Sequence, residues 1–152
     1  MEKGKLKREI LEAGKIKIGV TISDFQERIN ELKAVTVGND LQEIASQSEF
    51  RKDADIELLD SLVVHLDFAK KELETINLID PSAEHHKVEF GSVVVTDKRK
   101  LFVSTGMEEV SVNNENYFGL SAQAPLYKNM AGCVVGDQVS FNGISYKILD
   151  IF

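Results

Sequence analysis

The stretch Leu78-Ile79-Asp80-Pro81 divides the sequence into two halves with different patterns. Before it, apolar residues recur at helical spacing; after it, short runs rich in β-branched residues alternate with turns. Proline has no backbone N–H and its ring disfavours a continuing helix, so a helix is expected to end here. The sequence therefore predicts an α+β fold with a helical arm at residues 1–80, a linker at 81–87 and a β-rich domain at 88–152.

The apolar residues of the arm follow the 3-4-3-4 spacing of a coiled coil. Its two halves supply the seam positions Leu11, Ile18, Ile22, Phe25, Ile29 and Leu32, and then Leu59, Leu62, Leu66, Ala69, Leu73 and Ile76. The phase continues across Gly14 and Gly19, so we expect one long first helix although glycine is a poor helix former. Gly38-Asn39-Asp40 is typical of a turn. The arm is therefore predicted to be an antiparallel helical hairpin, although a dimerising coiled coil would have the same pattern.

Turn signals separate several candidate strands in the second half. The candidate strands are residues 88–95, 100–104, 109–112, 117–121, 138–141 and 144–149. Pro125 is placed to begin a short helix and Gly132 to follow its end. Asn142-Gly143 between two alternating runs is the strongest short hairpin signal. We therefore expect a small antiparallel sheet with one short helix packed on it.

Composition excludes several classes of protein. The 152 residues carry a net charge of −7, which disfavours a protein that coats duplex nucleic acid. No stretch is apolar and long enough to span a membrane, and the charged start MEKGKLKREI is not a secretory signal. The single cysteine, Cys133, fits a reducing compartment. These features predict a cytoplasmic protein with no membrane partner.

Few residues have the arrangement of an enzyme's active site. His85 and His86 are adjacent in a linker and lack companion ligands, and His65 lies beside seam position Leu66, so structural or exposed roles are expected for all three. Cys133 is flanked by glycine and valine and is expected to be a small buried thiol. The sequence has no phosphate-binding glycine loop and no nucleophile motif. We therefore do not expect this protein to be an enzyme on its own.

The order of these parts resembles the GreA/GreB family of bacterial transcription elongation factors, over nearly the whole chain. The most specific stretch lies in the body. Ser121-Ala122-Gln123-Ala124-Pro125-Leu126, then Ala131-Gly132, then Val135-Gly136-Asp137-Gln138-Val139 are similar to the family's Ser-Pro-Leu/Ile, Leu-Gly and Gly-Asp-x-Val segments. The closing NGISYKILDI is similar to its final hairpin. The resemblance implies an antiparallel coiled coil followed by an FKBP-like domain.

The family carries two working acids in a Gly-Asp-Leu-x-Glu-Asn motif at the end of its hairpin. This chain keeps the Asp-Leu-x-Glu core as Asp40-Leu41-Gln42-Glu43, but Asn39 separates the glycine from the aspartate and Ile44 replaces the asparagine. The second helix is expected to be a few residues longer than usual, which would place Glu49, Asp53 or Asp55 nearer the tip. The resemblance implies that Asp40 and Glu43 are the catalytic and metal-binding acids.

The resemblance implies a factor that enters the secondary channel of RNA polymerase and stimulates cleavage of backtracked transcripts. Asp40 would help to hold a second Mg²⁺ jointly with the polymerase, and Glu43 would position or deprotonate the attacking water near the nascent RNA 3′ end. The chain itself would act as a monomer and an accessory factor. One alternative is a regulator or inhibitor of RNA polymerase with the same fold and no cleavage activity.

Two further alternatives concern the separate parts. An FKBP-like body suggests a peptidyl-prolyl isomerase, but the chain has no tryptophan and its body has few aromatic residues. The arm alone suggests a structural coiled-coil dimer. Positive charge gathers at the base of the arm, and either an RNA-guiding patch or a solvated helix face explains it. The residues concerned are Lys3, Lys5, Lys7, Arg8, Lys15 and Lys17.

Overall fold

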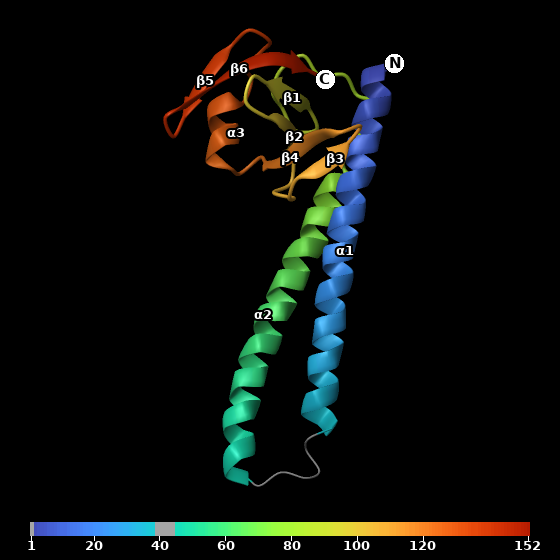
Figure 1. The fold of residues 1–152 in the computed structure, drawn as a ribbon, viewed down its shortest axis with the longest axis vertical. Coiled ribbons are helices and arrows are strands. Elements are labelled where there is room, and N and C mark those ends of the chain that lie inside the picture. The colour runs from blue at the N-terminus through green and yellow to red at the C-terminus, as the bar shows by residue number, and fades with distance from the viewer. Residues whose placement is uncertain (1, 39–44) are drawn as a thin grey trace. The chain divides into compact units, whose positions relative to one another are not determined.

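The computed structural model describes residues 2–38 and 45–152, with side chains for residues 2–34 and 54–152. Along the chain the elements are α1 (Glu2–Gly38), α2 (Ala45–Asn77), β1 (Val93–Thr96), β2 (Lys100–Ser104), β3 (Val110–Val112), β4 (Glu115–Ser121), α3 (Pro125–Met130), β5 (Gln138–Phe141) and β6 (Ile144–Ile151) (Figure 1). The α+β class predicted from the sequence is confirmed. None of the described helices is both long and apolar enough to cross a membrane.

The chain divides into two compact units. The hairpin unit is Gly19–Lys71, and the body unit joins Met1–Ile18 to Glu72–Phe152. The body unit thus contains the sheet together with the first turns of α1 and the last turns of α2.

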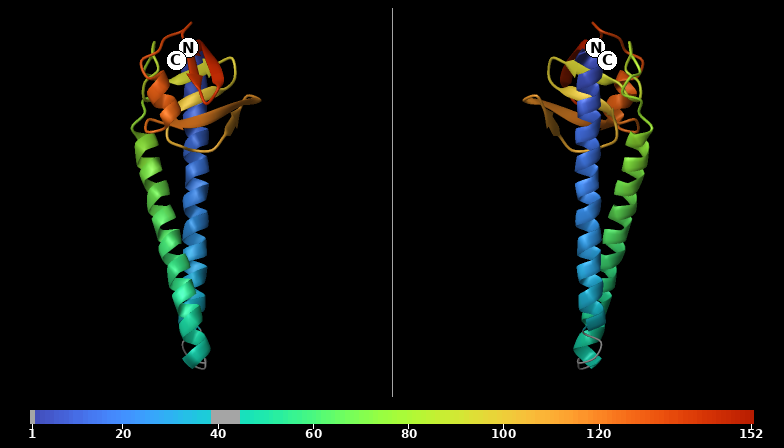
Figure 2. Two further views of the ribbon diagram at one scale, coloured as in Figure 1. Left: turned by 90° about the vertical axis from the view of Figure 1, so that its left-hand side faces the viewer. Right: turned by 90° about the vertical axis from the view of Figure 1, so that its right-hand side faces the viewer.

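The hairpin unit is a pair of helices held by an apolar seam. Figures 1 and 2 show its two helical segments side by side, and they run antiparallel. Ile29, Leu62 and Leu66 are buried together. The partly buried residues around them are Ile22, Phe25, Leu32 and Leu59. All seven are seam positions predicted from the spacing, so this part of the predicted seam is confirmed.

Helix α1 continues through Gly14 and Gly19, as the unbroken heptad phase predicted. Close packing within the body unit explains why position 14 is a glycine. A Cβ atom at this position would lie 2.7 Å from the Met107 sulfur and 3.0 Å from a methyl group of Ile76. Gly19 has open space around it. Gly14 therefore allows Met107 and the end of α2 to approach the helix closely.

The body unit contains a six-stranded sheet in the order β3-β4-β2-β1-β6-β5. All neighbouring strands are antiparallel except β2 and β4, which are parallel with Lys100 opposite Tyr117 and Ser104 opposite Ser121. The expectation of a wholly antiparallel sheet is corrected at this pair. The β3–β4 hairpin turns at Asn113-Asn114, with φ of 53° and 64°, and its second strand lies next to β2. Strand β3 runs opposite to β2, and β4 runs opposite to β3, so β4 has the same direction as β2.

The first predicted strand begins later than expected. Residues 88–95 were expected to be extended, but β1 starts at Val93 because a turn precedes it. Gly91 has φ of +91° in this turn, and the Ser92 hydroxyl donates to the Glu89 carbonyl at 2.6 Å. Val88 is buried and exchanges backbone hydrogen bonds with residues 132 and 133, both 2.8 Å long, instead of extending β1.

One hydrophobic cluster in the core of the body unit is formed by strand residues and by α3, which lies against β4 and β5 (Figure 1). Met130, in the last turn of α3, is fully buried against strand residues such as Val103 and Ile148. The predicted short helix is confirmed, with Pro125 in its first turn. The Asn142-Gly143 hairpin is confirmed as well, since it joins β5 to β6 with φ of 51° and 76°.

Candidate functional site

The two acids assigned to the tip of the hairpin, Asp40 and Glu43, lie outside the described residues. Helix α1 ends at Gly38 and α2 begins at Ala45, so both acids belong to the segment that joins the two helices. Their assignment as catalytic and metal-binding residues therefore stays a prediction.

The acids considered for a displaced tip lie within a helix. Glu49, Asp53 and Asp55 all fall inside α2, four or more residues after its start at Ala45. Asp55 is partly buried. The structure thus places these three acids on a helix and not in the segment between the two helices.

The stretch that carries the family resemblance forms the junction between β4 and α3. Ser121 is the last residue of β4, and its hydroxyl accepts a hydrogen bond from the Gln123 N–H at 3.1 Å. The Ser121 carbonyl accepts from the Ala124 N–H at 3.0 Å, which closes a turn. Pro125 then begins α3, where a missing N–H costs nothing because the first helical N–H groups have no helical partner. The serine therefore closes the turn after β4, and the proline four residues later begins α3.

The Gly-Asp pair of the same motif forms the turn before β5. Gly136 has φ of +96°, a conformation that favours glycine. The Asp137 carboxylate accepts a hydrogen bond from the Val134 N–H at 2.9 Å, and the Asp137 carbonyl accepts from the Ile148 N–H at 2.9 Å. The two residues thus fix the turn and join it to β6.

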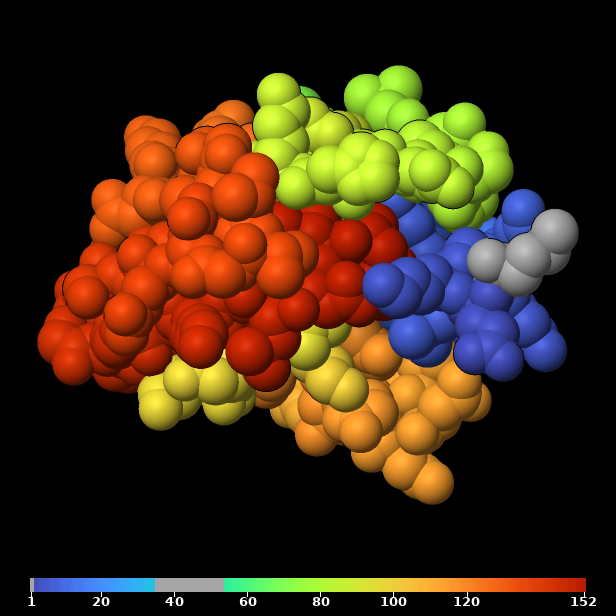
Figure 3. All heavy atoms as spheres, turned by 90° about the horizontal axis from the view of Figure 1, so that it is seen from above, coloured from blue at the N-terminus to red at the C-terminus, as the bar shows by residue number. Residues whose placement is uncertain are grey.

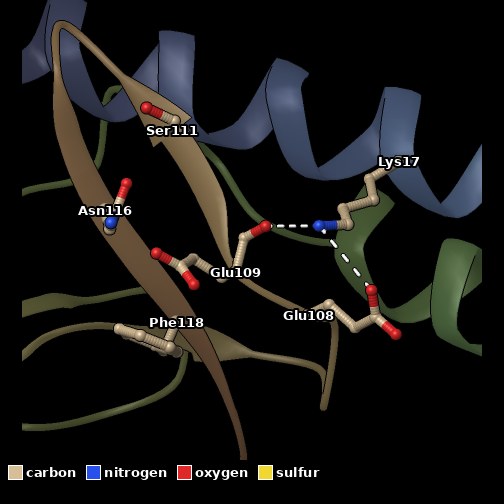
Figure 4. A pocket seen from close by; sticks show the side chains of 6 residues that line it. All are labelled: Lys17, Glu108, Glu109, Ser111, Asn116 and Phe118. Atoms are coloured by element: carbon tan, nitrogen blue, oxygen red, sulfur yellow. Dashed lines mark hydrogen bonds and ion pairs between the residues drawn. The ribbon is translucent and has the colours of Figure 1, made fainter.

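A cavity of about 530 Å³ lies between α1 and the β3–β4 hairpin within the body unit (Figure 4). Lys17 reaches across from α1. Its ammonium group donates to the Glu109 carbonyl and lies 3.7 Å from the Glu108 carboxylate. Ser111, Asn116 and Phe118 complete the lining. Lys17 thereby ties α1 to the chain just before β3.

This cavity has the character of a polar surface recess. The Glu108 side chain is exposed, so its ion pair with Lys17 contributes little to stability. Among the described side chains, no group of three or more His, Cys, Asp or Glu residues is placed to hold a metal ion. The cavity brings two carboxylates and one ammonium group together.

The most perturbed cation of the body unit is Lys7. Its side chain is 1% exposed, and its ammonium group donates to the Ala83 carbonyl at 3.1 Å. Burial lowers the pKa of Lys7 to about 8, although the charges of Asp80 and Glu89 raise it. Because it is buried, Lys7 fits neither of the two explanations left open for the cations at the base of the arm, an RNA-guiding patch and a solvated helix face. Its position three and four residues before the buried Ile10 and Leu11 is the sequence signal for this burial.

The segment that contains Ala83, which accepts the hydrogen bond from Lys7, also holds a short network of polar side chains. The Ser82 hydroxyl and N–H both donate to the Asp80 carboxylate, at 2.6 Å and 2.9 Å, and these bonds lower the pKa of Asp80. Lys7 and Arg8 lower it further through their charges. His85 lies 2.6 Å from the Glu89 carboxylate, and this hydrogen bond is the main cause of the lowered pKa of Glu89.

The three histidines are exposed or hydrogen-bonded, and Cys133 is less buried than expected. His65 is exposed and stacks on Phe25, with ring centroids 5.7 Å apart. His85 is bound to Glu89, and His86 is exposed. Cys133 is partly buried, and burial together with the charge of Asp137 raises its pKa, which keeps the thiol protonated near neutral pH.

Comparisons with known proteins give a structural likeness. No family model and no curated protein matches the chain. Among solved structures, the chain is similar to the transcription factor Gfh1, with 17% identity and a TM-score of 0.34, over 91% of this chain and 93% of that one.

Proposed function

We propose that this protein is a transcription factor of the Gre type, which binds bacterial RNA polymerase through the secondary channel and stimulates cleavage of backtracked transcripts. The observation that carries the proposal is the combined motif in the body, from Ser121 to Val139, in a chain that begins with a pair of long helices. In the proposal the protein acts in the cytoplasm as a monomer, and RNA polymerase is its partner.

The local structure of the motif supports this proposal. A serine that closes the β4 turn, a proline that begins α3 and a glycine–aspartate turn before β5 all occur in one continuous segment. Each residue type fits a particular hydrogen bond or backbone conformation. Their joint occurrence is therefore harder to explain by chance than any single match.

The proposed mechanism assigns the chemistry to the polymerase and the positioning to this chain. A second Mg²⁺ would stabilise the attacking and leaving oxygens of the phosphodiester. Carboxylate oxygens are ligands that Mg²⁺ prefers, so Asp40 and Glu43 have the right donor chemistry. Asp40 would supply a ligand oxygen, and Glu43 would orient a water or accept its proton near the RNA 3′ end. In the proposal the chain by itself is not an enzyme.

A transcript-cleavage assay on stalled RNA polymerase tests the proposed acids. Asp40→Asn and Glu43→Gln keep the shape of each side chain and remove its charge. Loss of a positioned acid–base group typically costs about 100-fold or more, so each variant should lose at least that much stimulation. Glu57→Gln and Asp60→Asn are the matched controls, because both residues are exposed acids on α2. Stimulation by Asp40→Asn and Glu43→Gln equal to that of the controls would refute the assigned roles.

The alternative of a regulator without cleavage activity has a specific observation in its favour. Asn39 interrupts the family's Gly-Asp pair, and Ile44 stands where the family has asparagine. Measuring polymerase binding and cleavage separately distinguishes the two functions. Binding without cleavage selects the regulator, and absence of binding overturns both.

A further inference from the structure

The body unit has a cleft of about 1140 Å³. It lies where the first turns of α1, residues 81–86 and the end of β6 meet. Figure 3 looks onto this face, with α1 in blue, the 81–86 region in yellow-green and β6 in red. Three segments that are distant in the sequence thus converge on one opening.

Two cations on the rim of this cleft are available to a ligand. Lys3 is engaged, because its ammonium group lies 2.9 Å from the Asp150 carboxylate. Lys5 and Arg8 also line the cleft and are exposed, and no salt bridge joins either of them to an acid within the described part of the chain. The guanidinium group of Arg8 can bind a carboxylate through two parallel hydrogen bonds.

Apolar side chains line the same cleft beside these cations. Val135 is 53% exposed, Phe152 is partly buried, and Ile151 lies at the base of the opening. An exposed valine and a partly exposed phenylalanine lie next to Lys5 and Arg8, so this surface can bind both a negatively charged group and an apolar group. A ligand that fits must therefore present negative charge and an apolar group together.

The acidic residues of the cleft favour a peptide over a nucleic acid as its ligand. Glu2 and Glu84 line the opening and are exposed, and the whole chain carries a charge of −7. A nucleic acid brings a phosphate at every nucleotide, so some of its phosphates would meet these carboxylates. A peptide can carry a single carboxylate toward Arg8 and leave the acids of the cleft facing neutral or basic groups.

We propose that the cleft binds a peptide segment of a partner protein in which a carboxylate side chain lies beside a large apolar side chain. The carboxylate is bound by Lys5 and Arg8, and the apolar side chain contacts Val135 and Phe152. This inference is independent of the proposed function, since it rests on the charged and apolar side chains that line the cleft and not on the family resemblance.

The test uses the full chain labelled with ¹⁵N and a synthetic acetylated peptide, Gly-Glu-Leu-Phe-Glu-Gly. In an NMR titration we expect the backbone resonances of Lys5, Arg8 and Val135 to shift on addition of the peptide. The double variant Lys5→Gln/Arg8→Gln should bind about tenfold more weakly, because charge-assisted hydrogen bonds are lost. Lys128→Gln is the control, since Lys128 is an exposed cation outside the cleft lining and should leave the affinity unchanged.

Two further probes separate charge from apolar contact. A peptide with glutamine in place of both glutamates, and one with alanine in place of leucine and phenylalanine, should each bind more weakly. Equal binding of either probe overturns the proposal, as do shifts confined to residues outside the cleft or the absence of shifts at millimolar peptide. Tighter binding of a hexauridylate oligonucleotide at the same residues would make the cleft a nucleic-acid surface and would also overturn it.

Discussion

Replacing Lys7 by methionine should change how the stability of this protein depends on pH. The side chain is 1% exposed, and burial lowers its pKa from the ordinary 10.5 to about 8. Between these two values the unfolded chain binds a proton at Lys7 that the folded protein does not bind. The free energy of unfolding must therefore rise with pH across this window, because the unfolded state has more protons to lose.

The size of the effect follows from the two pKa values. At about 1.4 kcal/mol for each pH unit, the difference between 10.5 and about 8 corresponds to about 3 kcal/mol over the full window. Most of it, about 2.5 kcal/mol, should appear between pH 7 and pH 10. Well below pH 8 Lys7 is protonated in both the folded and the unfolded state, so this contribution no longer changes with pH.

The assay is urea unfolding at a series of pH values, followed by circular dichroism, for wild type, Lys7→Met and Lys5→Met. Other lysines and tyrosines also titrate, so the quantity of interest is the difference between wild type and each variant. Lys5 is exposed on the same helix, and its variant should follow the wild-type curve. If the free energy of unfolding rises equally steeply with pH for wild type and Lys7→Met between pH 8 and pH 10, the reasoning about Lys7 is wrong.

Two packing predictions concern one residue of each unit. Leu66→Ala should destabilise the hairpin unit by about 2 kcal/mol, because Leu66 is 8% exposed in the seam, whereas Val64→Ala, at a residue 65% exposed, should change the unfolding free energy by less than about 0.5 kcal/mol. Gly119→Ala should cost at least about 1 kcal/mol, because its Cβ would lie 2.5 Å from the Thr105 carbonyl oxygen, whereas Gly106→Ala meets open space. Urea unfolding measures both pairs, and a control that loses as much stability as its partner would contradict the packing described.

The helical pair could be predicted from the sequence because its signals are local. A seam at 3-4-3-4 spacing fixes which face of each helix is buried, so the spacing alone identifies Ile29, Leu62 and Leu66 as buried residues. The same holds for the α3 helix that Pro125 begins and for the Asn142-Gly143 hairpin, where backbone preferences of single residues decide the conformation. The acids Asp40 and Glu43 came from the family resemblance and not from local signals of this kind.

Features that depend on contacts between distant parts of the chain were decided only by the tertiary structure. Strand β4 is parallel to β2 because the β3–β4 hairpin places its second strand at the edge of β2, and no local pattern fixes that choice. Val88 pairs with residues 132 and 133 instead of extending β1. Lys7 is buried because its helix packs on a segment more than seventy positions away, where Ala83 accepts its hydrogen bond. A lysine's own chemistry favours water, so only the surrounding tertiary contacts could determine its burial.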